Sequence, residues 1–173
     1  AWTWEPKSKQ YYYHHFLSEQ PDLNFRNPKV QEELLNVVKF WLDRGVDGFR
    51  FDVAHCYFVD EKFRDNPWSW QAFPSDENEE FQFQEHKYDL FQPETLDFVY
   101  EMRRVADSYS PKRLLLGEVL GAPETVKPYY GNEEHNGLDL VFNFTLTSSK
   151  FNAKSFLKTV NHIQSSLPEP LQP

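Results

Sequence analysis

Apolar positions along the chain fall into two patterns that alternate, one with a helical period and one of short unbroken runs. The first pattern predicts helices over residues 28–44, 93–110 and 153–166, with a shorter helical stretch at 124–130. The second pattern predicts buried strands over residues 47–53, 113–119 and 138–146. Helices and strands therefore follow one another in turn, which is the order of parallel βαβ units and predicts an α/β fold.

The first predicted helix has the clearest boundaries. Asn27 suits an N-cap, and Pro28 suits the first helical position. Gly45 supplies a C-terminal stop. The apolar face expected for this helix comprises Val30, Leu34, Val37, Val38 and Trp41. The last predicted helix is expected to carry its apolar residues on one side, namely Phe156, Leu157, Val160 and Ile163.

Two of the predicted strands end on a carboxylate. Because strand side chains alternate, Arg50 and Asp52 share one face of their strand. Glu118 comes at the end of the next strand along the chain, which otherwise consists of Leu, Gly and Val after Arg113. The carboxyl ends of parallel strands meet at one edge of a sheet, so we expect both carboxylates at a common cleft.

A carboxylate pair of this kind suits the cleavage of sugar acetals with retention of configuration, where the two groups stand about 5–5.5 Å apart. The Arg50 charge would keep Asp52 ionised and oriented, as a nucleophile requires. Poor solvation would keep a proton on Glu118, as a general acid requires. Each motif also has a structural interpretation, a buried ion pair or a helix cap. Their order on successive strands favours catalysis.

Composition narrows the class of partner. A net charge of −9 without a basic patch argues against nucleic acid, so a neutral small molecule fits better. Aromatic residues make up 17% of the chain, and their faces suit sugar rings as well as cores. Several of them lie in the long polar connection at residues 62–91, whose length is typical of a functional or a disordered segment. The sequence predicts no metal site, phosphate-binding loop or dinucleotide site.

The sequence gives no indication of the cellular compartment. The one cysteine, Cys56, cannot form an internal disulfide. No apolar run reaches the length of a membrane span, and the first residues lack a signal-peptide pattern.

Three motifs together resemble those of one enzyme family. They are Gly-Phe-Arg-Phe-Asp at 48–52, Gly-Glu-Val at 117–119 and Gln-Pro-Asp-Leu-Asn at 20–24. In this order and spacing they resemble the α-amylase superfamily, glycoside hydrolase family 13, in its α-glucosidase and oligo-1,6-glucosidase branch. The resemblance covers essentially the whole chain. It implies part of a (β/α)8 TIM barrel, with parallel strands four to six and their helices.

The same resemblance implies a domain division and an incomplete barrel. Residues 1–27 would be the end of an inserted small domain and its return loop, and residues 28–173 part of the catalytic barrel. A complete barrel needs roughly 250 residues, so 173 residues form a piece of one. The rest of the parent barrel is therefore an expected partner. We expect the isolated piece to lack useful turnover.

By similarity, Asp52 is the catalytic nucleophile, Glu118 the general acid and base, and Arg50 the residue that positions Asp52. Phe144 lies where related enzymes place an aromatic wall near the aglycone, or else in the core. His55 lies where amylases direct a polar side chain toward leaving-group subsites, or else is a loop histidine with a structural hydrogen bond. No cofactor is implied, and the calcium that many relatives carry would bind outside this segment.

The activity implied is that of a retaining exo-acting α-glucosidase on maltose-like or isomaltose-like oligosaccharides. Two alternatives stay open: a sucrose isomerase or glucosyl transferase of the same branch, and the non-enzymatic ectodomain of an amino-acid-transporter heavy chain. Members of the latter group tend to lose catalytic residues, which this chain keeps.

The preferred linkage stays open. In similar enzymes, valine at the position of Val53 is associated with tolerance of α-1,6 bonds. A single side chain discriminates between two linkages by only about 1–3 kcal/mol, which is too little to name the linkage.

Overall fold

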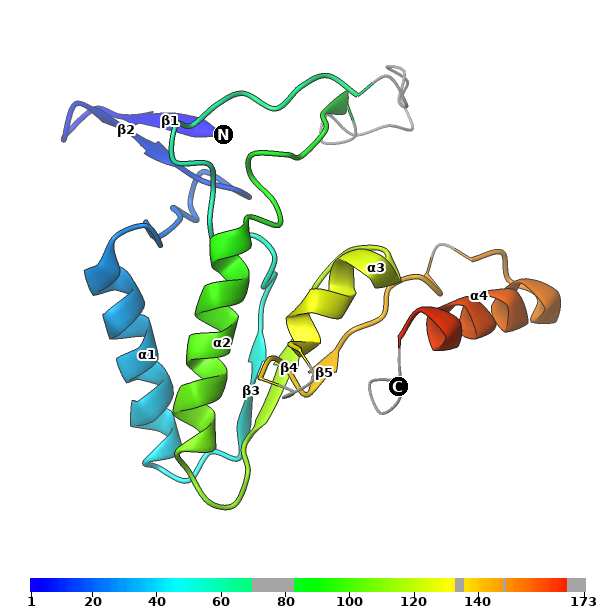
Figure 1. Ribbon diagram of the computed structural model, residues 1–173. Coiled ribbons are helices and arrows are strands. Elements are labelled where there is room, and N and C mark those ends of the chain that lie inside the picture. The colour runs from blue at the N-terminus through cyan, green and yellow to red at the C-terminus, as the bar shows by residue number, and fades with distance from the viewer. Residues whose placement is uncertain (70–82, 133–135, 148, 168–173) are drawn as a thin grey trace.

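A computed structural model describes residues 1–69, 83–132, 136–147 and 149–167 (Figure 1). A parallel sheet in the order β3-β4-β5 is its centre, formed by β3 (Gly48–Phe51), β4 (Leu114–Gly117) and β5 (Leu140–Val141). The helices are α1 (Pro28–Leu42), α2 (Pro93–Asp107), α3 (Pro123–Val126), the 3₁₀ helix η2 (Lys127–Tyr130) and α4 (Ala153–Ser166). An antiparallel hairpin of β1 (Trp2–Glu5) and β2 (Gln10–Tyr13) precedes them.

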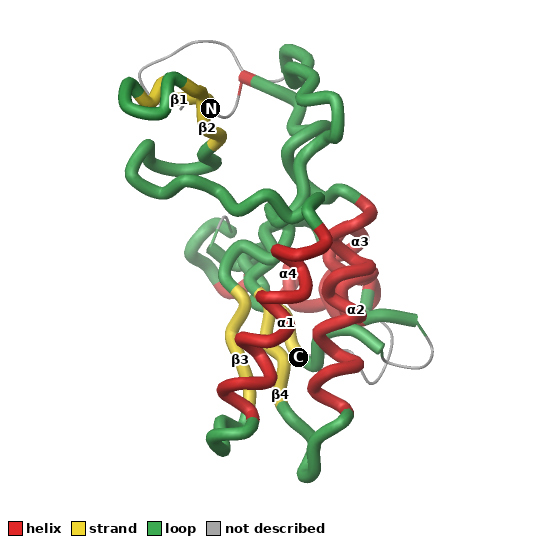
Figure 2. Tube along the Cα trace, turned by 90° about the vertical axis from the view of Figure 1, so that its left-hand side faces the viewer, coloured by secondary structure: helices red, strands yellow, loops and turns green. Residues whose placement is uncertain are grey.

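Helices α1 and α2 lie side by side along the sheet and run opposite to β3 and β4, as both views show (Figures 1 and 2). Their packing creates a core in which Val99 and Leu115 are fully buried. Asn27 accepts a hydrogen bond from the Lys29 N–H and Gly45 has φ +87°, as the cap and stop residues require. The alternation of helix and parallel strand agrees with the predicted α/β class.

Several helices and strands are shorter than predicted. β3 ends at Phe51 instead of residue 53, because the backbone of Val53 turns to φ +37°. The third strand contains only Leu140 and Val141. Phe142 and Phe144 after it have irregular backbone, and Leu146 lies in a turn. Helices α1 and α2 end at 42 and 107, two to three residues earlier than predicted. Residues 70–82 of the long connection lie outside the described residues.

The apolar face predicted for α1 was only partly right. Val38 and Leu42 are buried, whereas Val37 and Trp41 are 51% and 47% exposed. Successive residues of a helix are about 100° apart, so Val37 and Trp41 lie to one side of the stripe that meets the core. The same holds for α4, where Ile163 is buried but Leu157 is 62% exposed.

The β1–β2 hairpin was not predicted. Two of its four cross-strand pairs are aromatic: Trp2 meets Tyr13 with ring centroids 5.4 Å apart, and Trp4 meets Tyr11 at 5.0 Å. Such cross-strand pairs stabilise hairpins. In the sequence, the alternation of Trp2 and Trp4 with other residues was the signal that could have predicted the first strand of this hairpin.

A buried charge network fastens α2 to the sheet. Arg103 is 1% exposed and donates from Nη1 to Asp139 at 2.7 Å. Asp139 also pairs with Lys112 at 2.6 Å and accepts the Leu115 N–H at 2.8 Å. Burial opposes ionisation of Asp139, but these hydrogen bonds and the cations outweigh it, and the pKa of its carboxyl lies below the ordinary value.

Replacing Asp139 by Asn in the full-length protein should lower the free energy of unfolding by about 2 kcal/mol, because the buried Arg103 loses one of its two carboxylate partners and keeps only Asp107, at 2.8 Å. Since the folded-state pKa is depressed, this stabilisation is present above the ordinary carboxyl pKa and is lost as pH falls through the folded value. Urea unfolding at pH 7 and in acid measures both effects. The control is Asp47→Asn, which removes an exposed pair with Arg113 and should cost less than about 1 kcal/mol. Equal losses for the two variants would contradict the assignment.

Candidate active site

The register of β3 and β4 brings two carboxylates to the same edge of the sheet. Asp52 follows the end of β3, and Glu118 follows the end of β4. The Glu118 N–H donates to the Phe51 carbonyl at 2.9 Å, and the Ala54 N–H donates to the Glu118 carbonyl at 2.8 Å. These bonds extend the pairing of the two strands past their formal ends and fix the backbones that carry both carboxylates.

Arg50 lies between the two carboxylates. Its guanidinium donates one hydrogen bond to Asp52 and another to Glu118, each also an ion pair. Two carboxylates held by one planar fork must be close neighbours. The structure therefore brings the three predicted residues together. The bond to Asp52 agrees with the contact expected of Arg50. The bond between Arg50 and Glu118, which lie 68 positions apart in the sequence, was not predicted.

The two carboxylates differ in their solvation. The side chain of Asp52 is 70% exposed, and that of Glu118 is 17% exposed. Asp52 thus presents an open carboxylate to an incoming molecule. Glu118 is largely shielded from water, as expected of a group that shares a strand end with apolar neighbours.

A hollow of about 290 Å³ opens beside Asp52. One wall is formed by residues 20–23, which include most of the Gln-Pro-Asp-Leu-Asn motif, and another by Val53, Cys56 and Tyr57. Asp22 fixes part of this wall, because its side chain accepts the His15 N–H at 3.1 Å. The motif therefore has a place in the site, next to the residue that follows β3.

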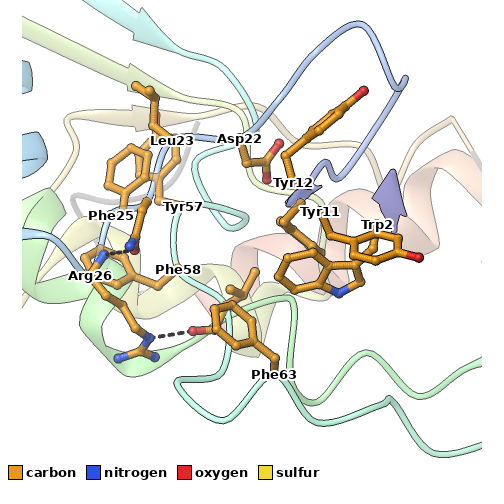
Figure 3. Close-up of a pocket in the computed structure, with 13 residues that line it drawn as sticks. Trp2, Tyr11, Tyr12, Asp22, Leu23, Phe25, Arg26, Tyr57, Phe58 and Phe63 are labelled. Carbon is orange, nitrogen blue, oxygen red and sulfur yellow. Dashed lines mark hydrogen bonds between the residues drawn. The ribbon is translucent and has the colours of Figure 1, made fainter. Parts of the chain in front are cut away.

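A second hollow of about 210 Å³ adjoins the first and is lined mainly by aromatic rings (Figure 3). The hairpin side contributes Trp2 and Tyr11, while Phe25 and Tyr57 stack with centroids 4.9 Å apart on the opposite side. Phe63 meets Trp2 edge to face at 5.2 Å. Phe25 and Tyr57 line both hollows. An aromatic cavity thus continues from the one that holds Asp52.

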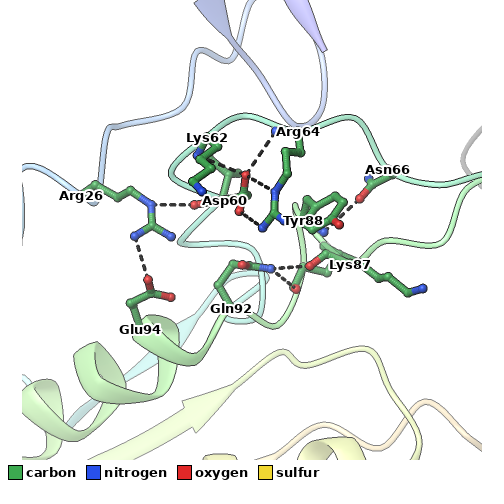
Figure 4. Close-up of polar contacts among 11 residues, drawn as sticks. Arg26, Asp60, Lys62, Arg64, Asn66, Lys87, Tyr88, Gln92 and Glu94 are labelled. Atoms are coloured by element: carbon green, nitrogen blue, oxygen red, sulfur yellow. Dashed lines mark hydrogen bonds and ion pairs between the residues drawn. The ribbon is translucent and has the colours of Figure 1, made fainter.

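Polar contacts tie the segment after Asp52 to the start of α2 (Figure 4). Arg26 donates from Nε to the Val59 carbonyl at 2.7 Å and pairs with Glu94 at 2.7 Å. The hydrogen bond from Arg26 holds the pKa of Glu94 below its ordinary value. Asp60 pairs with Arg64 at 2.6 Å. The wall of the aromatic hollow that Arg26 and Val59 line is therefore anchored to α2.

His55 is buried, at 3% exposure, and does not line the hollow beside Asp52. Its carbonyl accepts the Phe91 N–H at 2.9 Å, and its ring lies 5.1 Å from the Phe91 ring. Burial lowers the pKa of the imidazole, although a hydrogen bond with the Glu118 backbone acts in the opposite direction. Within the described residues its Nδ1 has no hydrogen-bond partner.

Phe144 lies beyond the short strand β5 and is half-buried. Its ring meets Phe142 edge to face at 6.1 Å. It is not among the described residues that form the core or line the hollow beside Asp52. Of the five predicted site residues, the structure joins Arg50, Asp52 and Glu118 through their side chains. His55 lies against the Glu118 backbone without lining the hollow, and Phe144 has no described contact with the other four.

Within the described ranges, no three or more His, Cys, Asp or Glu side chains are grouped so that they could hold a metal ion. Among the same residues, no helix is long and apolar enough to cross a membrane.

Comparison with known proteins bears directly on this site. The family described as "Alpha amylase, catalytic domain" matches residues 1–168. The chain belongs to the alpha-amylase family. This alpha-amylase segment is 44% identical over 155 residues to Maltase A2 of Drosophila melanogaster, which covers 84% of the chain and 27% of that protein.

Solved structures agree with the family. The α-glucosyl transfer enzyme XgtA matches the alpha-amylase segment with a TM-score of 0.84 at 37% identity, over 98% of this chain and 32% of that one. The isomaltulose synthase of Erwinia rhapontici matches with a TM-score of 0.75 at 30% identity, over 98% and 30%. The segment thus spans about 30% of the length of these relatives.

The family and its α-glucosidase branch, predicted from three motifs, are therefore confirmed, and so is the fold class. In this alpha-amylase segment, β3, β4 and β5 are consecutive parallel strands of a partial (β/α)8 barrel. The proposed division at residue 27 stays a prediction.

Proposed function

We propose that this segment carries the nucleophile and the acid/base group of a retaining α-glucosidase that removes terminal α-linked glucose from oligosaccharides. The observation that carries the proposal is the Arg50 fork, which holds Asp52 and Glu118 together at neighbouring strand ends of an alpha-amylase-family barrel. In (β/α)8 enzymes the active site lies at the carboxyl ends of the barrel strands, which is where this group of charges is found.

The proposed reaction gives each carboxylate a separate role. Ionised Asp52 attacks the anomeric carbon, the glycosidic C–O bond breaks, and Glu118 gives its proton to the departing sugar oxygen. The product of this step is a glucosyl ester on Asp52. Glu118, now a carboxylate, takes a proton from water as the water oxygen attacks the same carbon and frees Asp52. Two inversions leave the configuration unchanged. Arg50 stabilises the negative charge of the Asp52 carboxylate whenever Asp52 is not bonded to glucose.

The hollows support a neutral sugar as substrate. The cavity beside Asp52 would hold the glucosyl ring, and the aromatic cavity that adjoins it would hold the next sugar against Trp2 and Tyr57. Its volume of about 210 Å³ is below the ~300 Å³ at which drug-sized sites begin, which suits a single ring. The name of the relative Maltase A2 points to the same substrate class.

Glucosyl transfer or sucrose isomerisation is the second candidate. Two structural relatives favour it by name, an α-glucosyl transfer enzyme and an isomaltulose synthase. The chemistry differs only in the second step, where a sugar hydroxyl replaces water as the attacking group.

Product analysis tests the proposal. The full-length protein that contains this segment is incubated with maltose, isomaltose and sucrose to identify the products. The first-formed anomer of glucose is followed by NMR with p-nitrophenyl α-glucoside, whose leaving group is not a sugar. We expect α-glucose to appear before mutarotation. Initial β-glucose would overturn retention, and isomeric disaccharides from sucrose would support the second candidate. Protein that carries Asp52→Asn is the control for background hydrolysis.

The isolated 173-residue chain is expected to give no measurable hydrolysis of p-nitrophenyl α-glucoside. Strands β3 and β5 are edges of the described sheet, and Leu140 of β5 is 46% exposed. We propose that the remaining barrel strands cover these edges in the parent protein. Turnover by the piece, measured against the full-length protein at equal concentration, would contradict this expectation.

A further inference from the structure

Val53, the residue directly after Asp52, has an unusual backbone. Its φ is +37°, in the left-handed region that β-branched residues strongly avoid. A side chain with two substituents on Cβ is crowded by its own backbone in this conformation. Such a residue persists only where the surrounding structure over-determines it, and this happens most often at functional sites.

The surrounding hydrogen bonds identify what imposes this conformation. Beyond Val53, the Ala54 N–H donates to the Glu118 carbonyl at 2.8 Å, and Ala54 is fully buried. The Cys56 N–H donates back to the Val53 carbonyl at 2.9 Å. On the near side, the Glu118 N–H donates to Phe51 at 2.9 Å. The Glu118 backbone is thus bonded to the chain both before and after Asp52.

We propose that Val53 is a positioning residue whose left-handed backbone locks Asp52 at a fixed place relative to Glu118. The turn at Val53 lets the chain leave β3 at Asp52 and return at once to the Glu118 carbonyl. The two carboxylates then belong to one rigid frame, in addition to their shared contact with Arg50. The catalytic meaning of this frame rests on the function proposed above, whereas the strained turn itself does not.

A glycine would adopt the same turn without strain, so the presence of valine calls for a reason. Glycine populates positive and negative φ about equally, and the hydrogen bonds alone would then have to hold the turn. A branched residue has few alternative conformations once the surroundings have placed it. Valine therefore strains the backbone at this position, and in return the Asp52 carboxylate occupies a narrower range of positions.

The test compares Val53→Ala with Val53→Gly in the full-length protein. Both variants remove the branched side chain from the hollow, so the pair differs only by a Cβ. We expect the melting temperature of Val53→Gly to exceed that of Val53→Ala by a few degrees, because alanine still avoids positive φ. We expect kcat on p-nitrophenyl α-glucoside to be about tenfold lower for Val53→Gly than for Val53→Ala, with KM within about threefold.

Lys9 provides the matched control. It also has positive φ, at +54°, but it is exposed in the turn between β1 and β2. Lys9→Gly should be more stable than Lys9→Ala, with kcat equal within about twofold.

Two results would overturn the proposal. If Val53→Gly is less stable than Val53→Ala, or does not fold, the left-handed turn is absent, because glycine adopts such a turn without strain. If the two variants have equal kcat, the turn does not position Asp52. Failure of the proposed function is distinguishable, because full activity of Asp52→Asn would end the catalytic assignment and leave the order of melting temperatures unchanged.

Discussion

Replacing Asp52 by Asn in the full-length enzyme should lower kcat on maltose by at least about 10⁴-fold. The amide has nearly the shape of the carboxylate but carries no charge and is a poor nucleophile, so the glucosyl ester cannot form. Because the Asp52 side chain is 70% exposed, its replacement should leave the melting temperature almost unchanged. Steady-state kinetics and thermal unfolding on the same samples measure both expectations.

Asp47→Asn is the matched control. Asp47 stands directly before β3, at the opposite end of the same strand, with a side chain that is 96% exposed. Its loss should change kcat by less than about twofold. If Asp52→Asn keeps more than about 1% of the activity while Asp47→Asn keeps all of it, Asp52 is not the nucleophile.

The positions of Asp52 and Glu118 were predictable because each depends on one local pattern, an apolar strand that stops on a carboxylate. The alternation of helix and strand then placed both at one sheet edge. The contact of Arg50 with Glu118 depends instead on the register of β3 and β4, in which Arg50 pairs with Leu116. Register arises from tertiary packing across 68 residues, which no local pattern encodes.

Other misjudged features have a common cause in the incomplete barrel. Trp41, Leu146 and Leu157 were counted toward buried elements but are exposed in the described part of the chain. A hydrophobic pattern indicates which residues are buried in the complete protein. It does not indicate which of them are already buried within one segment. Sequence reasoning therefore overestimated the length of the third strand. β5 ends at Val141, and just beyond it the Phe142 N–H still donates to the Gly117 carbonyl of β4 at 3.0 Å.

Val53 illustrates a limit of another kind. Its sequence context predicts a strand, and β-branched residues favour strands. The observed positive φ comes from hydrogen bonds to the Glu118 backbone, so the local preference is overridden at the site where the two proposed catalytic groups meet. Conflicts between local preference and fold are expected at functional positions.

Replacing Glu118 by Gln should give a loss that depends on the leaving group. With maltose, the departing sugar oxygen needs a proton, and kcat/KM should fall by about 10²–10⁴-fold. With p-nitrophenyl α-glucoside, nitrophenolate departs without protonation, so the first step should be much less affected. The second step still needs a base, and the glucosyl ester on Asp52 should accumulate. Stopped-flow absorbance would then record a burst of nitrophenolate followed by slow turnover.

Azide distinguishes the roles of the two carboxylates by stereochemistry. In Glu118→Gln, azide needs no general base and attacks the glucosyl ester on Asp52, so the product is α-glucosyl azide after two inversions. In Asp52→Asn, no ester forms, and azide can only displace the leaving group directly, with one inversion, to give β-glucosyl azide. Glu124→Gln, at an exposed glutamate of α3, should behave as the unmodified enzyme in both assays. The same anomer from both catalytic variants would show that the two carboxylates do not have the separate roles proposed here.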